Sequence, residues 1–362
     1  MSKAFPSTPD FSGFNAPMLG DDTFISGDGM RGGAMSCIKS VLLAGLLLWQ
    51  AGTAMAQAPG YHSAVILPTC AYDCLIDHLR RYVDALDHKD ASRLPLSARL
   101  RFTENNVEMP LGNDGLWASI SKVRPDALEV ADVETGNAAW FGIVEEHGNP
   151  AYLALRLKVE GRQITEIETV VNRLPDMPKP FGNPDEVEHD PAFKEILAPA
   201  ERRSRERLIA VADGYFSTVE LNDGAIFTPF HEDCQRNENG ISTTRATGTG
   251  SAAIAQGCEE QFKLGIFRIN KQIRERRYPL VDVERGVVVA TGFFDHANRF
   301  DRYTLTDGRE MKTLLKWPNS ITLLEAFKIR DGKIYRIEAV FTYVPYFMHS
   351  PFAQANPDFQ TR

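Results

Sequence analysis

The sequence predicts an α+β fold built from two similar units. In each half of the chain one amphipathic helix comes first and several long strands follow, which favours α+β over an alternating α/β arrangement. Residues 154–171 and 324–341 match at a constant offset, which places Glu168 against Glu338. A proline-rich, acidic stretch between the two halves is typical of a linker.

The composition is that of an ordinary globular protein. The chain has 362 residues, of which 43% are hydrophobic and 24% are charged, and its formal net charge is −8. These values exclude a wholly disordered chain, a collagen-like chain and a polybasic nucleic-acid binder. At roughly 150 residues per domain, the length suggests two domains. The negative charge gives no electrostatic reason to bind nucleic acid or anionic lipid.

The N-terminal region carries the pattern of an export signal. The apolar run Val41–Trp49 follows Lys39 and is too short for a bilayer, which takes roughly 20 apolar residues. Ala54–Ala56 then forms a small-residue cleavage pattern. We expect a disordered segment or mis-assigned start over 1–34, a signal peptide over 35–56, and a periplasmic or secreted mature protein. A membrane anchor that is never cut is the alternative.

The remaining boundaries follow from the two halves and the stretch between them. We expect the first unit over 57–174, the linker over 175–200, the second unit over 201–352 and a tail over 353–362. The second half holds about 37 more residues between its helix and its last hairpin than the first half does. These inserted residues make the second unit the better candidate for a working pocket.

The helix that opens each unit has one apolar face. Apolar residues recur at helical spacing over Cys74–Lys89 and over Arg205–Leu221, and each stretch carries a central tyrosine, Tyr82 or Tyr215. The basic segment Lys263–Arg277 has the same spacing and predicts a further helix with a solvated face.

The matching stretches near the end of each half predict β-hairpins. Each has two runs with strand character on either side of a glycine-containing turn, at Glu160-Gly161 and at Asp331-Gly332.

Four cysteines remain once Cys37 leaves with the signal peptide. An even number in an oxidising compartment favours disulfides. We expect the pairs Cys70–Cys74 and Cys234–Cys258, because each pair lies within one half of the chain. Metal binding is the weaker alternative, because no histidine lies at zinc-like spacing from either pair.

Several sequence blocks connect both units to a known superfamily. The blocks are Thr103–Gly112, Gly115–Trp117, Asp233–Gly240, Gly257–Phe262, Arg276–Asp282, Phe293–His296 and Pro318–Ser320. With the leading helix and the final hairpin, they resemble a tandem of the nuclear transport factor 2-like superfamily, also called SnoaL-like, over most of residues 70–352. The resemblance implies two cone-shaped α+β barrel units, in which a curved antiparallel sheet wraps around helices and leaves an apolar pocket.

Within this superfamily the chain is similar to bacterial cofactor-independent diarylpropane lyases of lignin catabolism. The similarity implies a carbon–carbon lyase that releases formaldehyde from a lignin-derived diaryl diol and leaves a stilbene. The implied partner is a small aromatic substrate, and a homo-oligomer stays open. The alternatives are a non-catalytic protein that binds a hydrophobic small molecule, and an isomerase or hydratase of the same fold.

No motif in the sequence calls for a cofactor or a metal. Residues 248–253 superficially match a dinucleotide-binding pattern, but no apolar strand precedes them and no βαβ unit surrounds them. A P-loop, H-E-x-x-H, G-x-S-x-G and C-x-x-C are all absent from the sequence. We expect acid–base chemistry by side chains alone.

Asp295 and His296 are the first candidates for a general base. They follow the apolar strand expected over Val287–Thr291, and alternation sends them to opposite faces, so only one of them can line a pocket. Next to Phe293 and Phe294, that group would be desolvated and able to take a proton. The alternative is a strand end with a capping carboxylate and a solvated imidazole.

Further candidates lie beside Cys234 and on the second helix. Arg236 can bind a phenolate or carboxylate, Glu238 can take a hydroxyl proton, and Tyr215 can donate to a developing oxyanion. A surface turn and a plain core aromatic are the alternatives. Lys316, four residues after Lys312, could stabilise a phenolate or could lie on a solvated strand face.

Overall fold

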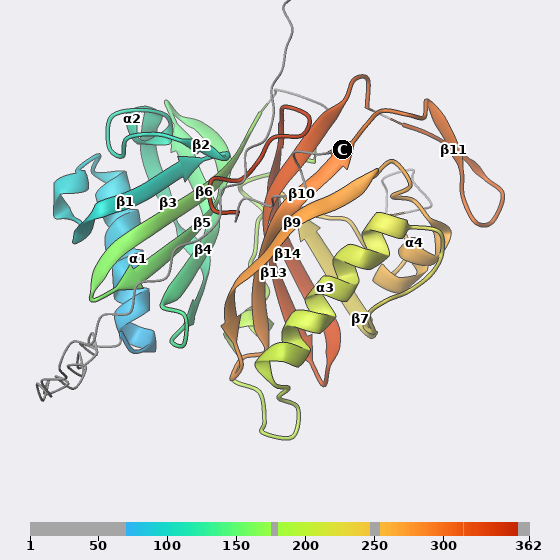
Figure 1. Ribbon diagram of the computed structural model, residues 1–362, viewed down its shortest axis with the longest axis horizontal. Helices are drawn as coiled ribbons and strands as arrows, with labels where there is room; N and C mark the ends of the chain where they lie inside the picture. The colour runs from blue at the N-terminus through green and yellow to red at the C-terminus, as the bar shows by residue number, and fades with distance from the viewer. Residues whose placement is uncertain (1–69, 175–179, 247–253, 314, 354–362) are drawn as a thin grey trace, which may run out of the picture. The chain divides into compact units, whose positions relative to one another are not determined.

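The computed structural model describes residues 70–174, 180–246, 254–313 and 315–353. The expected signal peptide, the rejected dinucleotide pattern over 248–253 and nearly all of the expected tail lie outside the described residues. The described residues belong to one compact unit that contains two curved six-stranded sheets and few helices (Figure 1). The α+β class predicted from the sequence is confirmed.

The first sheet is built after one long helix. Its strands lie in the order β2-β1-β6-β5-β4-β3. The elements are α1 (Tyr72–Asp87), β1 (Leu96–Glu104), β2 (Val107–Glu108), α2 (Leu116–Ser119), β3 (Ile120–Asp132), β4 (Asn137–Glu146), β5 (Asn149–Glu160) and β6 (Gln163–Arg173), with a 3-10 turn at Ala91–Arg93.

The second sheet repeats this topology in the order β8-β7-β14-β13-β10-β9. Its elements are α3 (Arg205–Leu221), β7 (Phe230–Glu238), β8 (Ile241–Ser242), α4 (Cys258–Leu264), β9 (Gln272–Asp282), β10 (Val287–His296), β13 (Asn319–Arg330) and β14 (Lys333–Val344). Strands β11 (Arg302–Thr304) and β12 (Glu310–Lys312) form a separate hairpin, and a 3-10 turn covers Pro191–Lys194 in the linker.

Two features of the sheets differ from the expectation. Each sheet is mostly antiparallel, but β1 is parallel to β6 and β7 is parallel to β14. The helix expected over Lys263–Arg277 is wrong, because β9 begins at Gln272 and pairs with β10 over residues that helical spacing had assigned to a helix. Main-chain pairing with a long neighbouring strand outweighs the local pattern there.

The glycine at one tight turn is repeated in both sheets. Gly136 and Gly286 each have a positive φ, and a Cβ at either position would meet a carbonyl oxygen, of Val159 or of Ile329, at 2.5 Å or 2.3 Å. Only glycine allows such a close approach of two backbones in this conformation. The repeat therefore extends beyond the matched hairpins.

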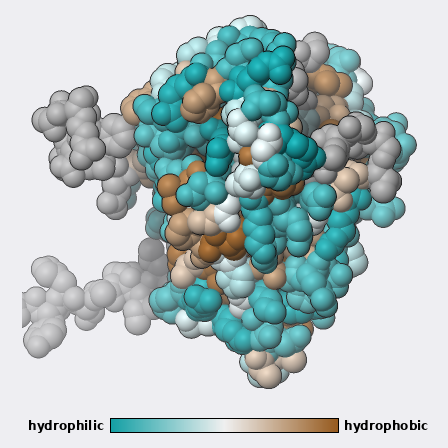
Figure 2. Space-filling view, turned by 90° about the vertical axis from the view of Figure 1, so that its right-hand side faces the viewer, coloured by the Kyte–Doolittle hydropathy of each residue, from teal (hydrophilic) through white to brown (hydrophobic). Residues whose placement is uncertain are grey.

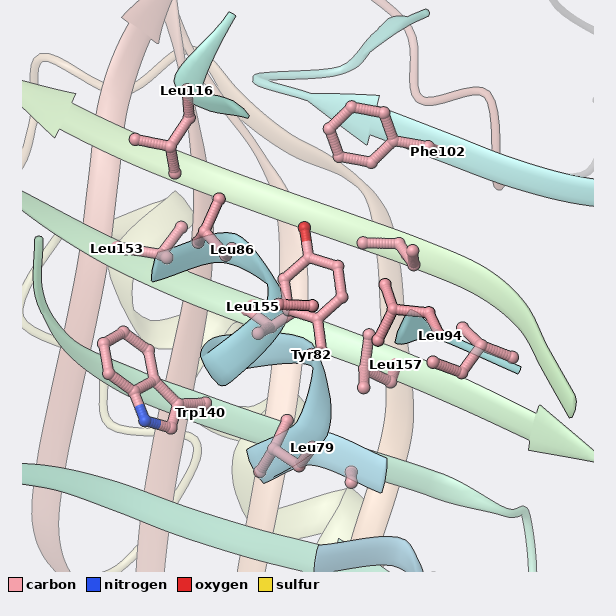
Figure 3. Close-up of a cluster of buried hydrophobic side chains, with 14 of the residues drawn as sticks. Leu79, Tyr82, Leu86, Leu94, Phe102, Leu116, Trp140, Leu153, Leu155 and Leu157 are labelled. Atoms are coloured by element: carbon pink, nitrogen blue, oxygen red, sulfur yellow. The ribbon is translucent and has the colours of Figure 1, made fainter. Parts of the chain in front are cut away.

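Apolar residues form a core inside each sheet and a third core between the sheets. In the first unit α1 lies against the concave face, and Tyr82 is surrounded by leucines from β5 (Figure 3). In the second unit α3 packs on its sheet in the same way. Strand alternation places Leu324 and Ala326 of β13 in the core between the sheets. The residues next to them along the strand, Leu323 and Phe327, lie in the interior of the second unit.

Both expected disulfides, Cys70–Cys74 and Cys234–Cys258, are confirmed. His78 does approach the first pair, with all three candidate ligand atoms within 4.8 Å, but the two sulfurs are bonded to each other. Two disulfides within the chain are typical of an oxidising compartment outside the cytoplasm. Among the described residues, no helix has the length and apolar character needed to cross a membrane.

Candidate functional site

A cavity of about 330 Å³ lies inside the second unit. Its wall is mostly apolar and aromatic, and a few ionisable groups face into it. The lining comprises Pro180, Tyr215, Val219, Arg236, Glu238, Phe267, Ile269, Asn270, Phe294, His296, Tyr303, Met311, Lys312, Thr313, Leu315, Ile321, Leu323, Glu325, Ala339, Phe341 and Tyr343. An apolar hollow with a small number of polar groups is the usual form of a small-molecule site.

The cavity collects four of the six residues selected from the sequence. Tyr215, Arg236, Glu238 and His296 all line it. They come from α3, β7 and β10, so three separate elements place them around one space.

The other two selected residues lie elsewhere. The Asp295 carboxylate points away from the cavity and accepts hydrogen bonds from Arg274 Nε at 2.7 Å and from Ser320 Oγ at 2.5 Å. Alternation along β10 causes this, because the neighbouring His296 takes the inward position. Lys316 is exposed and is not part of the lining, whereas Lys312 is.

Arg236 is a buried cation with an incomplete set of partners. Its Nη2 donates to Gln261 Oε1 at 2.9 Å and its Nη1 to the Tyr215 hydroxyl at 3.5 Å, while Nε has no partner among the described residues. The guanidinium also lies 5.1 Å and 4.9 Å from the ring centroids of Phe262 and Phe267. Burial alone would lower the pKa of Arg236, but Glu238 and Tyr215 outweigh it and raise that pKa.

Tyr215 connects this cation to a second carboxyl group. Its ring packs edge-on against Phe262 at 5.3 Å and Phe327 at 5.0 Å, which fixes the hydroxyl in place. The hydroxyl accepts a hydrogen bond from Arg236 Nη1, and it lies close enough to Glu325 to affect the pKa of that carboxyl group. Burial raises the pKa of Tyr215 well above its ordinary value, so the phenol keeps its proton and remains a donor.

Glu325 is a candidate site residue that the sequence analysis missed. It lies on β13 between apolar neighbours, is 2% exposed, and its Oε2 has no partner among the described residues. Burial, and then the charge of Glu238, raise the pKa of Glu325 to about 8, although Arg236 and Tyr215 act in the opposite direction. Glu325 is therefore a protonated acid at neutral pH.

A signal for Glu325 was present in the sequence. It stands alone as a charged residue within the apolar strand pattern Leu323–Phe327. At the constant offset that relates the two hairpins, the residue matched to Glu325 is Leu155. A carboxyl group at a position that is aliphatic in the other repeat calls for an explanation.

His296 lies at the end of β10, where its strand pairs with β13. Its Nδ1 is 2.9 Å from Asn319 Oδ1, and Asn319 Nδ2 donates to the Trp317 carbonyl oxygen at 3.0 Å. The second bond orients the amide, so Oδ1 faces the ring and Nδ1 carries the proton. Burial lowers the pKa of His296, which keeps the imidazole neutral with a basic Nε2.

Together these groups can move protons inside an apolar space. Glu325 and Glu238 are two carboxyl groups in different environments, of which Glu325 is held protonated, and this is how neighbouring carboxyls divide into an acid and a base. Arg236 and Tyr215 can stabilise the negative charge that remains when Glu325 gives up its proton. The arrangement suits acid–base chemistry on a hydrophobic molecule.

The β11–β12 hairpin contributes to one side of the cavity. Tyr303, Met311 and Lys312 of this hairpin line the cavity, and the Tyr303 hydroxyl donates to the Ile266 carbonyl oxygen at 2.7 Å. Phe300 and Trp317, in the flanking segments, are 41% and 54% exposed. Figure 2 looks onto the side of the molecule that carries this hairpin and shows apolar surface among hydrophilic side chains.

Comparison with known protein families gives a match that covers most of the second unit. A family described as a domain of unknown function, DUF8021, matches residues 201–341. The chain matches none of the curated proteins.

Three solved structures show weak similarity. AclR from Streptomyces galilaeus is 15% identical over 30% of this chain and 91% of its own, with a TM-score of 0.25. A protein from Sphaerobacter thermophilus is 20% identical over 28% of this chain and 96% of its own, with a TM-score of 0.21. A protein of unknown function with a cystatin-like fold from Methylobium petroleophilum PM1 is 17% identical over 38% and 99%, with a TM-score of 0.24.

Proposed function

We propose that the protein is a cofactor-independent lyase that cleaves a carbon–carbon bond in a hydrophobic diaryl diol of the diarylpropane type and releases formaldehyde. The reaction takes place in the cavity of the second unit. Both units have the curved α+β arrangement that the resemblance to the nuclear transport factor 2-like superfamily implies, and the lyase similarity seen in the sequence motivates the choice of substrate.

One observation carries the proposal. Glu325 is a buried carboxylic acid whose Oε2 has no partner among the described residues, and it shares the cavity with the Glu238 carboxylate. A buried polar atom without a partner is costly in a folded protein and points to a ligand or a catalytic role. An acid and a base side by side can give and receive one proton each in a single turnover.

The reaction can be written with a balanced set of protons and electrons. Glu238 takes the proton of the primary hydroxyl, the bond to the hydroxymethyl carbon breaks, and formaldehyde leaves. The freed electron pair forms the carbon–carbon double bond of the stilbene and expels the benzylic hydroxyl, which leaves as water with the proton of Glu325. Arg236 and Tyr215 stabilise the new Glu325 carboxylate, and proton exchange between the two carboxyls restores the starting state.

Formaldehyde release from a purified diarylpropane diol tests this function. The wild-type protein is expected to give formaldehyde and a stilbene in equal amounts. Glu325→Gln preserves the shape but removes the acid, and we expect turnover to fall about 100-fold or more. Glu232→Gln is the matched control, because Glu232 is an exposed glutamate on the same strand as Glu238 and does not line the cavity.

Two results would contradict the proposal. If no diaryl diol releases formaldehyde, the lyase function is wrong, and tight binding of such diols without turnover would favour a carrier for hydrophobic molecules. If Glu325→Gln turns over at the wild-type rate, the acid is another group. Isomerisation or hydration of the same substrates, followed by mass spectrometry, would identify the alternative chemistry.

We also infer that the mature protein is periplasmic or secreted and begins at Gln57. Two disulfides within the chain support an oxidising compartment. Sequencing the N-terminus of the protein isolated from the host would show Gln57 if the signal peptide is cut as expected. An intact Met1 or Met35 in the exported fraction would contradict this cleavage site.

A further inference from the structure

The polar groups in the cavity fall into two places that are well separated along β13. Asn319, Ile321, Leu323 and Glu325 alternate inward along this strand. At about 3.3 Å per residue, six residues cover about 20 Å of strand. Because His296 pairs with Asn319, it lies far along the wall from Glu325, and the apolar Ile321 and Leu323 stand between them.

This separation gives His296 a different task from the acid and base. Glu325, Glu238, Tyr215 and Arg236 surround one end of the cavity, where the reaction is placed. The carbons that change bonds in a diaryl diol are direct neighbours, so His296 cannot serve the same bonds. Its neutral ring, with the proton on Nδ1, offers a hydrogen-bond acceptor at the other end.

Asn270 supplies a second acceptor at the same end. It immediately precedes Lys271, whose backbone N–H donates to the Asp295 carbonyl oxygen at 2.8 Å, so it lies beside the end of β10. Its side chain lines the cavity, and its Oδ1 is buried without a partner among the described residues. A buried acceptor of this kind is satisfied when a ligand brings a donor.

We propose that His296 and Asn270, the distal polar pair, recognise a hydroxyl group on an aromatic ring of the ligand. This inference rests on the proposed function in that it names the substrate class: a long diaryl molecule with a phenol or catechol at one end and the reacting carbons at the other. Both acceptors favour a neutral hydroxyl: a phenol donates its one hydrogen to either of them, and a catechol supplies one hydrogen to each. They disfavour a phenolate, which would repel them, and a methyl ether, which has no hydrogen to give.

The apolar wall between the two ends fits this class. Ile321, Leu323, Phe294 and Phe341 line the cavity between the distal polar pair and Glu325. Flat rings can pack against these side chains, which stabilises the ligand without fixing its direction. The hydroxyl at the distal polar pair then sets the orientation and brings the diol carbons to the acid and base.

Binding of two matched stilbenes tests the inference without relying on turnover. We would measure the dissociation constants of 4-hydroxystilbene and 4-methoxystilbene by ligand fluorescence. The wild-type protein is expected to prefer the hydroxyl compound by about tenfold or more, the value of one good hydrogen bond to a buried group. His296→Leu and Asn270→Leu should each reduce this preference several-fold and leave the affinity for the methoxy compound within about twofold. Glu232→Gln should keep the full preference.

The outcomes are distinguishable from those of the lyase assay. If the preference holds and depends on the distal polar pair while no formaldehyde is released, the recognition stands and the lyase function is wrong. If formaldehyde is released but both variants keep the preference, or both stilbenes lose affinity equally, the recognition is wrong. Failure of both stilbenes to bind the wild-type protein would also overturn it. Thermal unfolding of each variant shows that it is folded.

Discussion

The two units share one topology but fill their interiors differently. In the first unit β4 pairs Trp140 with Leu155, and both side chains are buried in an apolar core (Figure 3). At the matching place of the second unit β10 pairs Ala290 with Glu325. A tryptophan and a leucine are replaced by an alanine and a carboxylic acid, and the cavity wall includes that acid.

The strands at the sheet edge differ in the same direction. Phe102 pairs with Ile167 in β6, and its counterpart Arg236 pairs with Ile337 in β14. Tyr82 occupies the place of Tyr215, but in the first unit its hydroxyl accepts a hydrogen bond from Trp117 Nε1 at 3.0 Å. The tyrosine of the first unit has an indole partner, whereas that of the second contacts Arg236 and Glu325.

A third difference concerns the charged residues near the strand ends. In the first unit Arg173 donates to Glu104 at 2.8 Å and to Glu146 at 2.5 Å, so both carboxylates have an ion-pair partner. The positions that match these three residues in the second unit are Tyr343, Glu238 and His296, all of which line the cavity. One framework thus carries either an apolar core with ion-paired carboxylates or a cavity lined by ionisable groups, and the two differ at a few side chains.

The largest expected effect comes from giving the first unit the acid of the second. Leu155→Glu places a carboxyl group in the apolar core of the first unit, where it gains no counterpart of Arg236. We therefore expect the free energy of unfolding to fall by more than about 4 kcal/mol. Urea denaturation measures it. The reciprocal change, Glu325→Leu, should abolish turnover and leave the stability equal or higher. Equal losses of stability in the two variants would remove the contrast between the units.

The next effect tests whether the first interior is closed by its tryptophan. Trp140→Ala removes a large, 3% exposed side chain from the core, and we expect a loss of about 3–5 kcal/mol. Thermal unfolding followed by circular dichroism measures the loss. As a control, Trp317→Ala changes an exposed tryptophan and should alter stability by less than about 0.5 kcal/mol. A small loss for Trp140→Ala would mean that the first unit tolerates a cavity too.

The pH dependence of turnover follows from Glu325. Because the pKa of Glu325 is raised to about 8 and the acid must be protonated, turnover should be constant near pH 7 and fall about tenfold per unit well above pH 8. Steady-state rates between pH 6 and pH 10 measure this fall in turnover. A profile that stays flat to pH 10 would contradict an acid role for Glu325.

The smallest expected effect concerns two matched, buried glutamates on the sheet faces that point away from the interior of each unit. Glu168 accepts from Arg156 Nε at 2.9 Å and from Arg277, whereas Glu338 is 2.6 Å from His189 Nδ1. Burial alone would lower the pKa of His189, but Glu338 outweighs it and raises that pKa above 6.5.

The sign of this effect on stability is fixed by the raised pKa. The stabilisation from charged His189 is complete below pH 6.5 and is lost as the pH rises through the raised value. His189→Gln should therefore cost about 1.5 kcal/mol at pH 5.5 and little at pH 9. Urea denaturation at both pH values measures it. A cost that does not change with pH would assign the pair to a neutral hydrogen bond.

Local patterns predicted much of this fold correctly. The helix over Arg205–Leu221, both hairpin turns and both disulfides are found as expected, because each depends on residues close together in the chain or on a simple pairing within one half. The basic helix over Lys263–Arg277 failed, since its residues gain more from pairing β9 with β10.

The candidate site was predicted in part. Alternation along β10 predicted that only one of Asp295 and His296 could line the cavity, but it did not predict which of the two side chains points inward. The register with β13, which sets His296 against Asn319, decided it. The apolar neighbours of Glu325 and its match to Leu155 mark the position as unusual, but they do not show whether its face of the strand is buried or solvated.

The sequence by itself determined the helix that opens each unit, the repeated hairpin and the cysteine pairs, since periodicity and spacing act over short stretches of chain. Tertiary structure alone decided which side chains share the cavity and which carboxyl group keeps its proton. Tyr215, Arg236 and Glu325 lie far apart in the chain. The pKa of Glu325 depends on the burial and the charges that arise where α3, β7 and β13 come together. Proton chemistry in this protein is therefore a property of the assembled interior.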